Sequence, residues 1–182
     1  KKGNHFAQYQ YALLLLDGAV GKPDADGAFQ LLSIAARGGD DAASALIARM
    51  HVQGLGGKQN IAKGMGILAR LEKEKFPDAY YQLGLIYQSD AGGMRDQAKA
   101  ADYFRRGAEL DQRQAAEALA VMLHAGDGVA KNLPEAVRYY RQAIKSGYPR
   151  AMNNLAAMTE SGEGTPADVA QAMALYRRAA QM

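Results

Sequence analysis

The sequence predicts an all-α fold, a right-handed α-solenoid of five 36-residue helix-turn-helix repeats. Three observations in one register predict it: a column of alanines, paired columns of glycines and a column of helix-capping residues. The alanine column recurs without insertion or deletion at Ala7, Ala43, Ala79, Ala115 and Ala151. Because a single helix pair cannot cover its own apolar face, units that repeat in this way must stack on their neighbours.

The first helix of each repeat is indicated by apolar residues that fall on one helical face. A small residue stands five positions after the alanine and allows neighbouring helices to approach closely. A large residue stands directly before it. The small residues are Ala12, Ala48, Gly84, Ala120 and Ala156, and the large ones are Tyr11, Ile47, Leu83, Leu119 and Leu155.

The turn after the first helix is marked by glycines. Glycine adopts the left-handed conformation that ends a helix without steric cost. The first glycine of the turn is Gly18, Gly54, Gly126 or Gly162, with Asp90 as the exception, and the second is Gly56, Gly92, Gly128 or Gly164, with Val20 as the exception. We therefore expect the turns of the first and third repeats to be built differently from the others.

The second helix of each repeat is preceded by a residue suited to N-capping, because its side chain accepts a hydrogen bond from the amides of the first turn. These residues are Asp24, Asn60, Asp96, Asn132 and Asp168. Together the signals predict no strand and helices over residues 5–17, 24–38, 41–53, 60–74, 77–89, 96–110, 113–125, 132–146, 149–161 and 168–181.

The amino-acid composition argues against several classes of function. Apolar residues make up 48% of the 182 residues, which is typical of a folded chain, and no apolar run is long enough to span a bilayer. The net charge of +3 is modest and mixed with acidic residues, so we expect no nucleic-acid partner. The absence of cysteine excludes disulfides, thiolate metal sites and cysteine nucleophiles.

The fourth repeat carries a recognisable series of residues. Gly126 and Gly128 are followed by Asn132, then by Ala136 and the pair Tyr139-Tyr140. In this order they resemble the Sel-1-like repeat family, a relative of the tetratricopeptide repeat, and the resemblance extends over the whole chain. The 36-residue period and the paired glycines favour this family over the tetratricopeptide repeat, whose period is shorter.

This resemblance implies a non-catalytic scaffold or adaptor for protein–protein interactions, carried as a segment of a larger bacterial protein. Family members are often exported, which suggests the periplasm, although the sequence leaves the cytoplasm open. We expect one domain over 1–182, in which the exposed ends of the array pack against further protein. Its expected parts are a tail of a preceding repeat at 1–4 and repeats at 5–40, 41–76, 77–112, 113–148 and 149–182.

The candidate binding site is the concave face, which first helices line in solenoids of this kind. Its candidate residues vary among repeats and are not required by the repeat itself. Tyrosine and arginine among them are also the residue types most enriched at interface hot spots. The predicted contacts with a protein or peptide partner are Tyr9, Arg49, Tyr81, Gln88 and His124. The competing interpretation is that these side chains pack one repeat against the next.

Catalytic motifs are missing from the sequence. There is no nucleophile elbow, Walker loop or zinc-binding helix motif, so we predict no enzyme, no cofactor and no metal. Two other functions stay open. The chain is a regulatory segment of an enzyme or signalling protein whose active site lies elsewhere, or it binds polyanions through arginines aligned along the second helices. These arginines are Arg70, Arg105, Arg106, Arg141, Arg177 and Arg178.

Overall fold

The computed structural model describes residues 4–181, and every regular element in that range is helical. Five successive helix pairs are joined by short turns, and one short 3₁₀ helix follows the fifth helix. Each predicted helix is confirmed to within one residue at both ends. The elements are α1 (His5–Asp17), α2 (Ala25–Arg37), α3 (Asp41–Gln53), α4 (Ile61–Lys73), α5 (Pro77–Gln88), η1 (Ala91–Gly93), α6 (Gln97–Glu109), α7 (Arg113–Ala125), α8 (Leu133–Lys145), α9 (Arg150–Ser161) and α10 (Val169–Ala180).

Each second helix begins at the predicted capping residue. In all five, the Asp or Asn side chain accepts a hydrogen bond from the backbone N–H three residues later, at 2.9–3.1 Å. Such a cap contributes about 1 kcal/mol. Asn4 caps α1 in the same way, accepting from the Ala7 N–H at 3.0 Å. The rest of the predicted tail, residues 1–3, lies outside the described residues.

The first glycine of the turn ends four of the five first helices in the left-handed conformation, with φ between 71° and 79°. In the third repeat, where the sequence has Asp90, Ser89 follows the last residue of α5 in an extended conformation and the chain continues into η1. In the first repeat, Gly21 rather than Val20 takes a positive φ, of 144°. The expected differences in these two turns are therefore present.

The second glycine of the turn makes a contact between repeats. Gly128, with φ 71°, lies against the first residue of α6, so that a Cβ there would be 2.5 Å from the carbonyl oxygen of Gln97. Gly164 meets Leu133 at the start of α8 at the same distance from its carbonyl carbon. The turn of one repeat thus rests on the N-terminus of the preceding second helix, and any side chain would separate them.

The turn after the second helix also needs a left-handed residue. Gly39 and Gly147 supply it without strain, but Lys75 (φ 54°) and Asp111 (φ 58°) adopt the same conformation with a side chain present. A non-glycine residue in this region costs roughly 1 kcal/mol or more. Two of the four turns therefore carry backbone strain.

The small residues of both helices form the innermost layer. The first-helix column is fully buried at Ala12, Ala48, Ala120 and Ala156, and the second-helix column is buried at Ala28, Ala100, Ala136 and Ala172. At the equivalent position in the second repeat, a Cβ on Gly64 would collide with the carbonyl oxygen of Ala48. Helices α3 and α4 therefore approach each other too closely for alanine.

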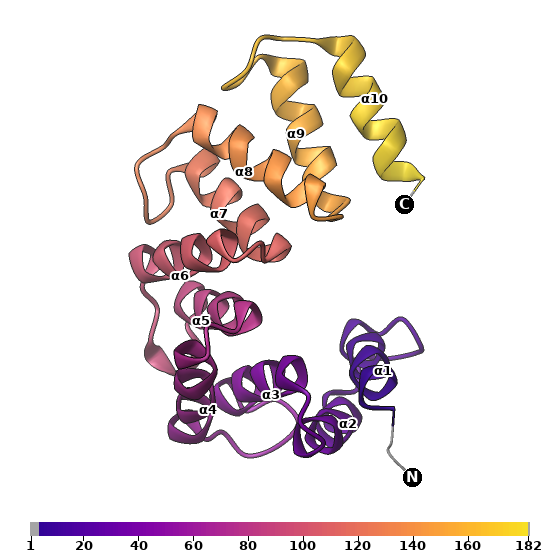
Figure 1. The fold of residues 1–182 in the computed structure, drawn as a ribbon, viewed down its shortest axis with the longest axis vertical. Helices are drawn as coiled ribbons and strands as arrows, with labels where there is room; N and C mark the ends of the chain where they lie inside the picture. Colours follow the sequence, from indigo (N-terminus) through magenta and orange to yellow (C-terminus); the bar gives the residue numbers. More distant parts are fainter. Residues whose placement is uncertain (1–3, 182) are drawn as a thin grey trace. The chain divides into compact units, whose positions relative to one another are not determined.

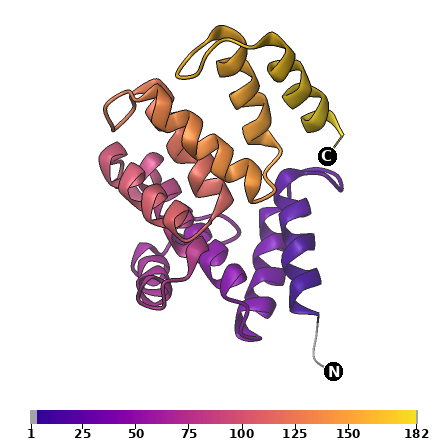
Figure 2. The ribbon, with the colours of Figure 1, turned by 45° about the horizontal axis from the view of Figure 1, so that its top comes forward.

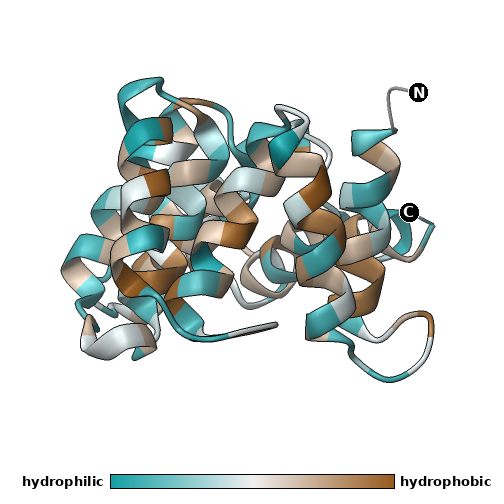
Figure 3. Ribbon diagram, turned by 90° about the horizontal axis from the view of Figure 1, so that it is seen from below, coloured by the Kyte–Doolittle hydropathy of each residue, from teal (hydrophilic) through white to brown (hydrophobic). Residues whose placement is uncertain are grey.

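The chain divides into two compact units, one of α1 to α5 that ends at Arg95 and one of α6 to α10 that begins at Asp96. In the first, α2 packs on α1 and α3, and α3 on α4 and α5 (Figure 1). In the second, each helix packs on the next, and Figure 2 shows α7 beside α8 and α9 beside α10. Hydrophobic and hydrophilic residues alternate along individual helices, as one-sided burial requires (Figure 3). This is the fold of an α-solenoid of helix-turn-helix repeats; its right-handedness and its single-domain organisation stay predictions.

Candidate partner-binding surface

Three predicted contact residues lie on consecutive first helices of the first unit. Tyr9 is on α1, Arg49 on α3 and Tyr81 on α5, and all three are partly buried. Tyr9 and Tyr81 occupy equivalent positions two repeats apart, and the equivalent residue of the intervening repeat is Ala45, which is fully buried. Arg49 follows Ala45 by one helical turn, on the same face of α3. The charge of Arg49 interacts with both tyrosines.

Arg49 is held by neutral partners. Its Nε donates to Oε1 of Gln82 on α5 at 2.7 Å, and one of its terminal nitrogens donates to Oε1 of Gln53 at 3.4 Å. Burial lowers the pKa of Arg49, although Tyr81 and Tyr9 act to raise it. A partly desolvated cation whose hydrogen bonds go to amide oxygens has charge left to attract a carboxylate from outside.

The two tyrosines belong to the same electrostatic environment. Burial raises the pKa of Tyr9 to about 12, with further increases from Asp78 and Asp40 and a decrease from the Arg49 charge. Tyr9 also packs against the apolar core around α1, α2 and α3. The structure therefore brings Tyr9, Arg49 and Tyr81 close enough to influence one another, which sequence spacing suggested but could not show.

The other two predicted contacts differ in their relation to this cluster, since Gln88 shares α5 with Tyr81 and His124 lies on α7. Gln88 is the last residue of α5 and is partly buried. His124 is in the second unit, near the end of α7, and its Nε2 lies 2.6 Å from Oε2 of Glu163 in the next turn. Its ring therefore already bridges the fourth and fifth repeats.

Polar bridges between repeats are a feature that the sequence did not reveal. In the second unit, the position of Tyr9 is taken by Glu117, which is buried and accepts a hydrogen bond from Asn154 of the next repeat at 3.0 Å. Arg150 lies 3.6 Å from the same carboxylate oxygen. Burial raises the pKa of Glu117 in spite of Arg150 and Asn154. Part of this face therefore packs repeat to repeat, as the competing interpretation held.

Large apolar side chains are exposed on the first and last helices. They are Phe6, Tyr11 and Leu14 on α1, and Val169, Met173 and Tyr176 on α10. These are the helices on which the sequence predicted packing against further protein, and that packing stays a prediction. None of the helices described is long and apolar enough to cross a membrane. Over residues 4–181, no group of three or more His, Asp or Glu side chains is arranged to hold a metal ion.

Stacked helix pairs with glycine turns and capped second helices define the chain as a repeat protein of the α-solenoid class. The model of the Sel1 repeat matches residues 5–40, 42–69, 77–112, 113–148 and 149–182. The chain therefore belongs to the Sel1 repeat family, whose members are generally protein-interaction scaffolds and typically non-catalytic. No curated protein matches the chain in sequence.

Several solved structures share the fold. A protective antigen present in uropathogenic Escherichia coli strains is 24% identical, with a TM-score of 0.70 over 98% of this chain and 38% of its own. A Sel1 repeat protein from Oxalobacter formigenes is 23% identical, with a TM-score of 0.67 over 99% of this chain and 72% of its own. An immunity protein from Pseudomonas aeruginosa is 20% identical, with a TM-score of 0.65 over 98% of this chain and 65% of its own. The chain thus spans little more than a third of the length of the first of these proteins.

Proposed function

We propose that this chain is a non-catalytic scaffold that holds a protein segment on the face formed by its first helices. Tyr9, Arg49 and Tyr81 form the centre of that surface in the first unit, and Gln88 follows Tyr81 on the same helix. His124, on α7, is the proposed contact of the second unit. The observation that carries the proposal is the environment of Arg49, a partly buried guanidinium flanked by two tyrosines and hydrogen-bonded to Gln82 and Gln53.

The chemistry of this cluster suits a protein partner. Tyrosine offers a large apolar surface with a polar end, at little cost in conformational entropy. Arginine recognises carboxylates through two parallel hydrogen bonds. Family membership supports the same class of function.

The test begins with affinity capture on the immobilised chain, with the captured protein identified by mass spectrometry and its binding then measured by calorimetry. Replacing Tyr81→Ala and Arg49→Gln together should weaken binding about thirtyfold or more, since a hot-spot residue contributes about 2 kcal/mol. Leu55→Ala is the control, because Leu55 is a large side chain in the turn after α3 that is 42% exposed and lies outside the cluster.

Circular dichroism must show that each variant keeps its helices. Unchanged affinity in the Tyr81→Ala, Arg49→Gln variant contradicts the assignment. If affinity is instead lost when Arg105, Arg141 and Arg177 are replaced, and falls steeply with salt, the second helices bind a polyanion and the proposal is wrong.

A further inference from the structure

The second helices carry cavities that recur three repeats apart. One pair of equivalent cavities lies between successive second helices, over the large apolar residue of the first helix between them. In the first unit it measures about 340 Å³ between α2 and α4, over Ile47. In the second unit it measures about 390 Å³ between α8 and α10, over Leu155. Ile47 and Leu155 belong to one sequence column, so the two grooves occupy equivalent positions of the repeat.

A second pair of cavities lies beside the first. In the first unit it measures about 390 Å³ and includes Gln30, Ser33, Ile34 and Arg37 of α2. In the second unit it measures about 710 Å³. There the four equivalent positions of α8 are Arg138, Arg141, Gln142 and Lys145. The same scaffold thus carries one cation in the first repeat and three in the fourth.

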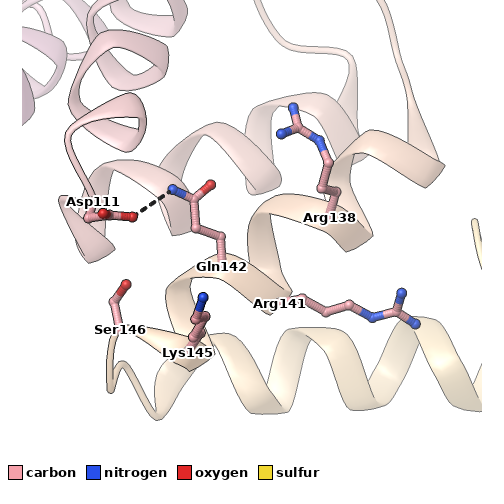
Figure 4. A pocket seen from close by; sticks show the side chains of 6 residues that line it. All are labelled: Asp111, Arg138, Arg141, Gln142, Lys145 and Ser146. Carbon is pink, nitrogen blue, oxygen red and sulfur yellow. Dashed lines mark hydrogen bonds between the residues drawn. The ribbon is translucent and has the colours of Figure 1, made fainter.

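The fourth-repeat cavity has an ordered floor. Gln142 donates from Nε2 to the carbonyl oxygen of Ala108 at 2.6 Å and to Oδ1 of Asp111 at 3.4 Å, which ties α8 to the turn after α6. Figure 4 shows the bond between Gln142 and Asp111, with the side chains of Arg138 and Arg141 extending away from Asp111 and in different directions. Arg138 is 3.2 Å from Glu135 and lies over the ring of Tyr139 at 4.2 Å, so its position is defined.

Arg141 connects the two cavities of the second unit. It lines the basic cavity and also the apolar groove, whose other walls include Ile144 of α8 and Leu175 of α10. Neither Arg141 nor Lys145 forms an ion pair with a described residue. A carboxylate bound at the cations would therefore stand directly beside an apolar side chain in the groove.

We propose that α8 carries a docking site for a protein segment in which an acidic residue adjoins a large apolar one. The carboxylate binds Arg141, with Arg138 and Lys145 adding positive charge around it, and the apolar side chain enters the groove over Leu155. This site consists of other residues than the first-helix face of the proposed function. It would give the scaffold a second contact with a protein, one that recognises an acidic and an apolar side chain. The charge complementarity and the apolar groove together favour such a segment over a polyanion, which has nothing to place in the groove.

Two further features oppose a densely charged ligand. Asp111 already places a carboxylate in the cavity. Glu135 places a second carboxylate 3.2 Å from Arg138. One carboxylate can be matched by the remaining cations of the cavity, Arg141 and Lys145. A phosphate chain would meet Asp111 and Glu135 as well.

The first repeat supplies the control. Replacing Arg138→Gln and Arg141→Ser gives the fourth repeat the residues that the first repeat carries at these positions, so the helix is expected to form. The probe is a short fluorescein-labelled peptide with two glutamates beside two leucines, followed by anisotropy. We expect the double variant to bind it about tenfold more weakly, since each exposed charge contributes less than about 1 kcal/mol.

The reverse exchange tests sufficiency. Gln30→Arg with Ser33→Arg, beside the existing Arg37, should raise the stoichiometry from one peptide per chain to two. A peptide with glycines in place of the leucines should bind more weakly to the unaltered chain. The proposal is overturned if the labelled peptide does not bind, if the double variant binds it equally well, or if inorganic polyphosphate competes more strongly than unlabelled peptide.

Failure here and failure of the proposed function are distinguishable. The Tyr81→Ala, Arg49→Gln variant alters only the first helices and should bind the acidic peptide normally. A chain that captures a protein through the first helices but ignores the peptide would leave the proposed function standing and exclude this second site.

Discussion

The contact between the second glycine of a turn and the preceding second helix is open to a direct test. We consider Gly128→Ala. The new Cβ would lie 2.5 Å from both the carbonyl carbon and oxygen of Gln97 and 2.6 Å from its Cβ. Because two of these three atoms belong to the backbone, no side-chain rotation can relieve the contact, and the turn must move away from α6.

Two costs add in this variant. The left-handed conformation, with φ 71°, costs alanine about 1–2 kcal/mol. Displacing packed backbone costs about a further 1–3 kcal/mol. In Gly126→Ala, the conformational cost is similar because φ is 79°, but the nearest atom is the side-chain Cβ of Lys131 at 3.3 Å. The difference between the two variants therefore isolates the contact between repeats.

Urea denaturation followed by circular dichroism measures both variants. We expect Gly128→Ala to lose about 2–5 kcal/mol of unfolding free energy and Gly126→Ala about 1–2 kcal/mol. Each kcal/mol should also lower Tm by about 2–4 °C in a chain of this size. Equal losses in the two variants would show that the second glycine is required only for its backbone conformation, and that the contact with α6 adds nothing.

Two other positions give predictions about stability, one for a substitution at Lys75 and one for the pH dependence caused by Glu117. Lys75→Gly should raise the unfolding free energy by about 1 kcal/mol, because glycine removes the strain of φ 54°; a lower Tm in this variant would contradict that reasoning. Burial raises the pKa of Glu117 above its ordinary 4.5, so the stability that its protonated form contributes is present below that pH and is lost as pH rises through the raised pKa. As pH rises above 4.5 and through this raised pKa, the unaltered chain should therefore lose stability relative to Glu117→Gln in urea titrations, and a constant difference would refute the pH dependence.

Helix boundaries could be predicted from the sequence because they are set by local chemistry. An Asp or Asn side chain can accept a hydrogen bond from the amide three residues later, and this bond does not depend on the surrounding structure. Asp24 and Asn60 therefore fix where α2 and α4 begin. Glycine in the left-handed conformation likewise fixes where α1 and α3 end, at Gly18 and Gly54. The sequence also predicted a different turn at Asp90, where the glycine is missing. It did not predict that this turn would contain a 3₁₀ helix.

The candidate surface was less predictable because it depends on contacts between repeats. Register placed Tyr9, Arg49 and Tyr81 on one face, but the hydrogen bond from Arg49 to Gln82 joins residues on different helices that no periodicity relates. The pairing of His124 with Glu163 is of the same kind. The cavities along α8 could have been anticipated by aligning the second helices, where Ser33 and Arg141 share a position.

The recurrence of the cavities has a consequence for how such arrays diversify. Ser33 and Arg141 occupy equivalent positions in the cavities of the first and fourth repeats, and they differ. The repeats pack on one another through other residues, namely buried alanines such as Ala28 and Ala136 and turn glycines such as Gly128. Folding and recognition are therefore encoded at separate sites within each repeat. A duplicated repeat can acquire a new ligand preference by surface substitution alone, with its neighbours unaffected, so each added unit is an independent opportunity for selection.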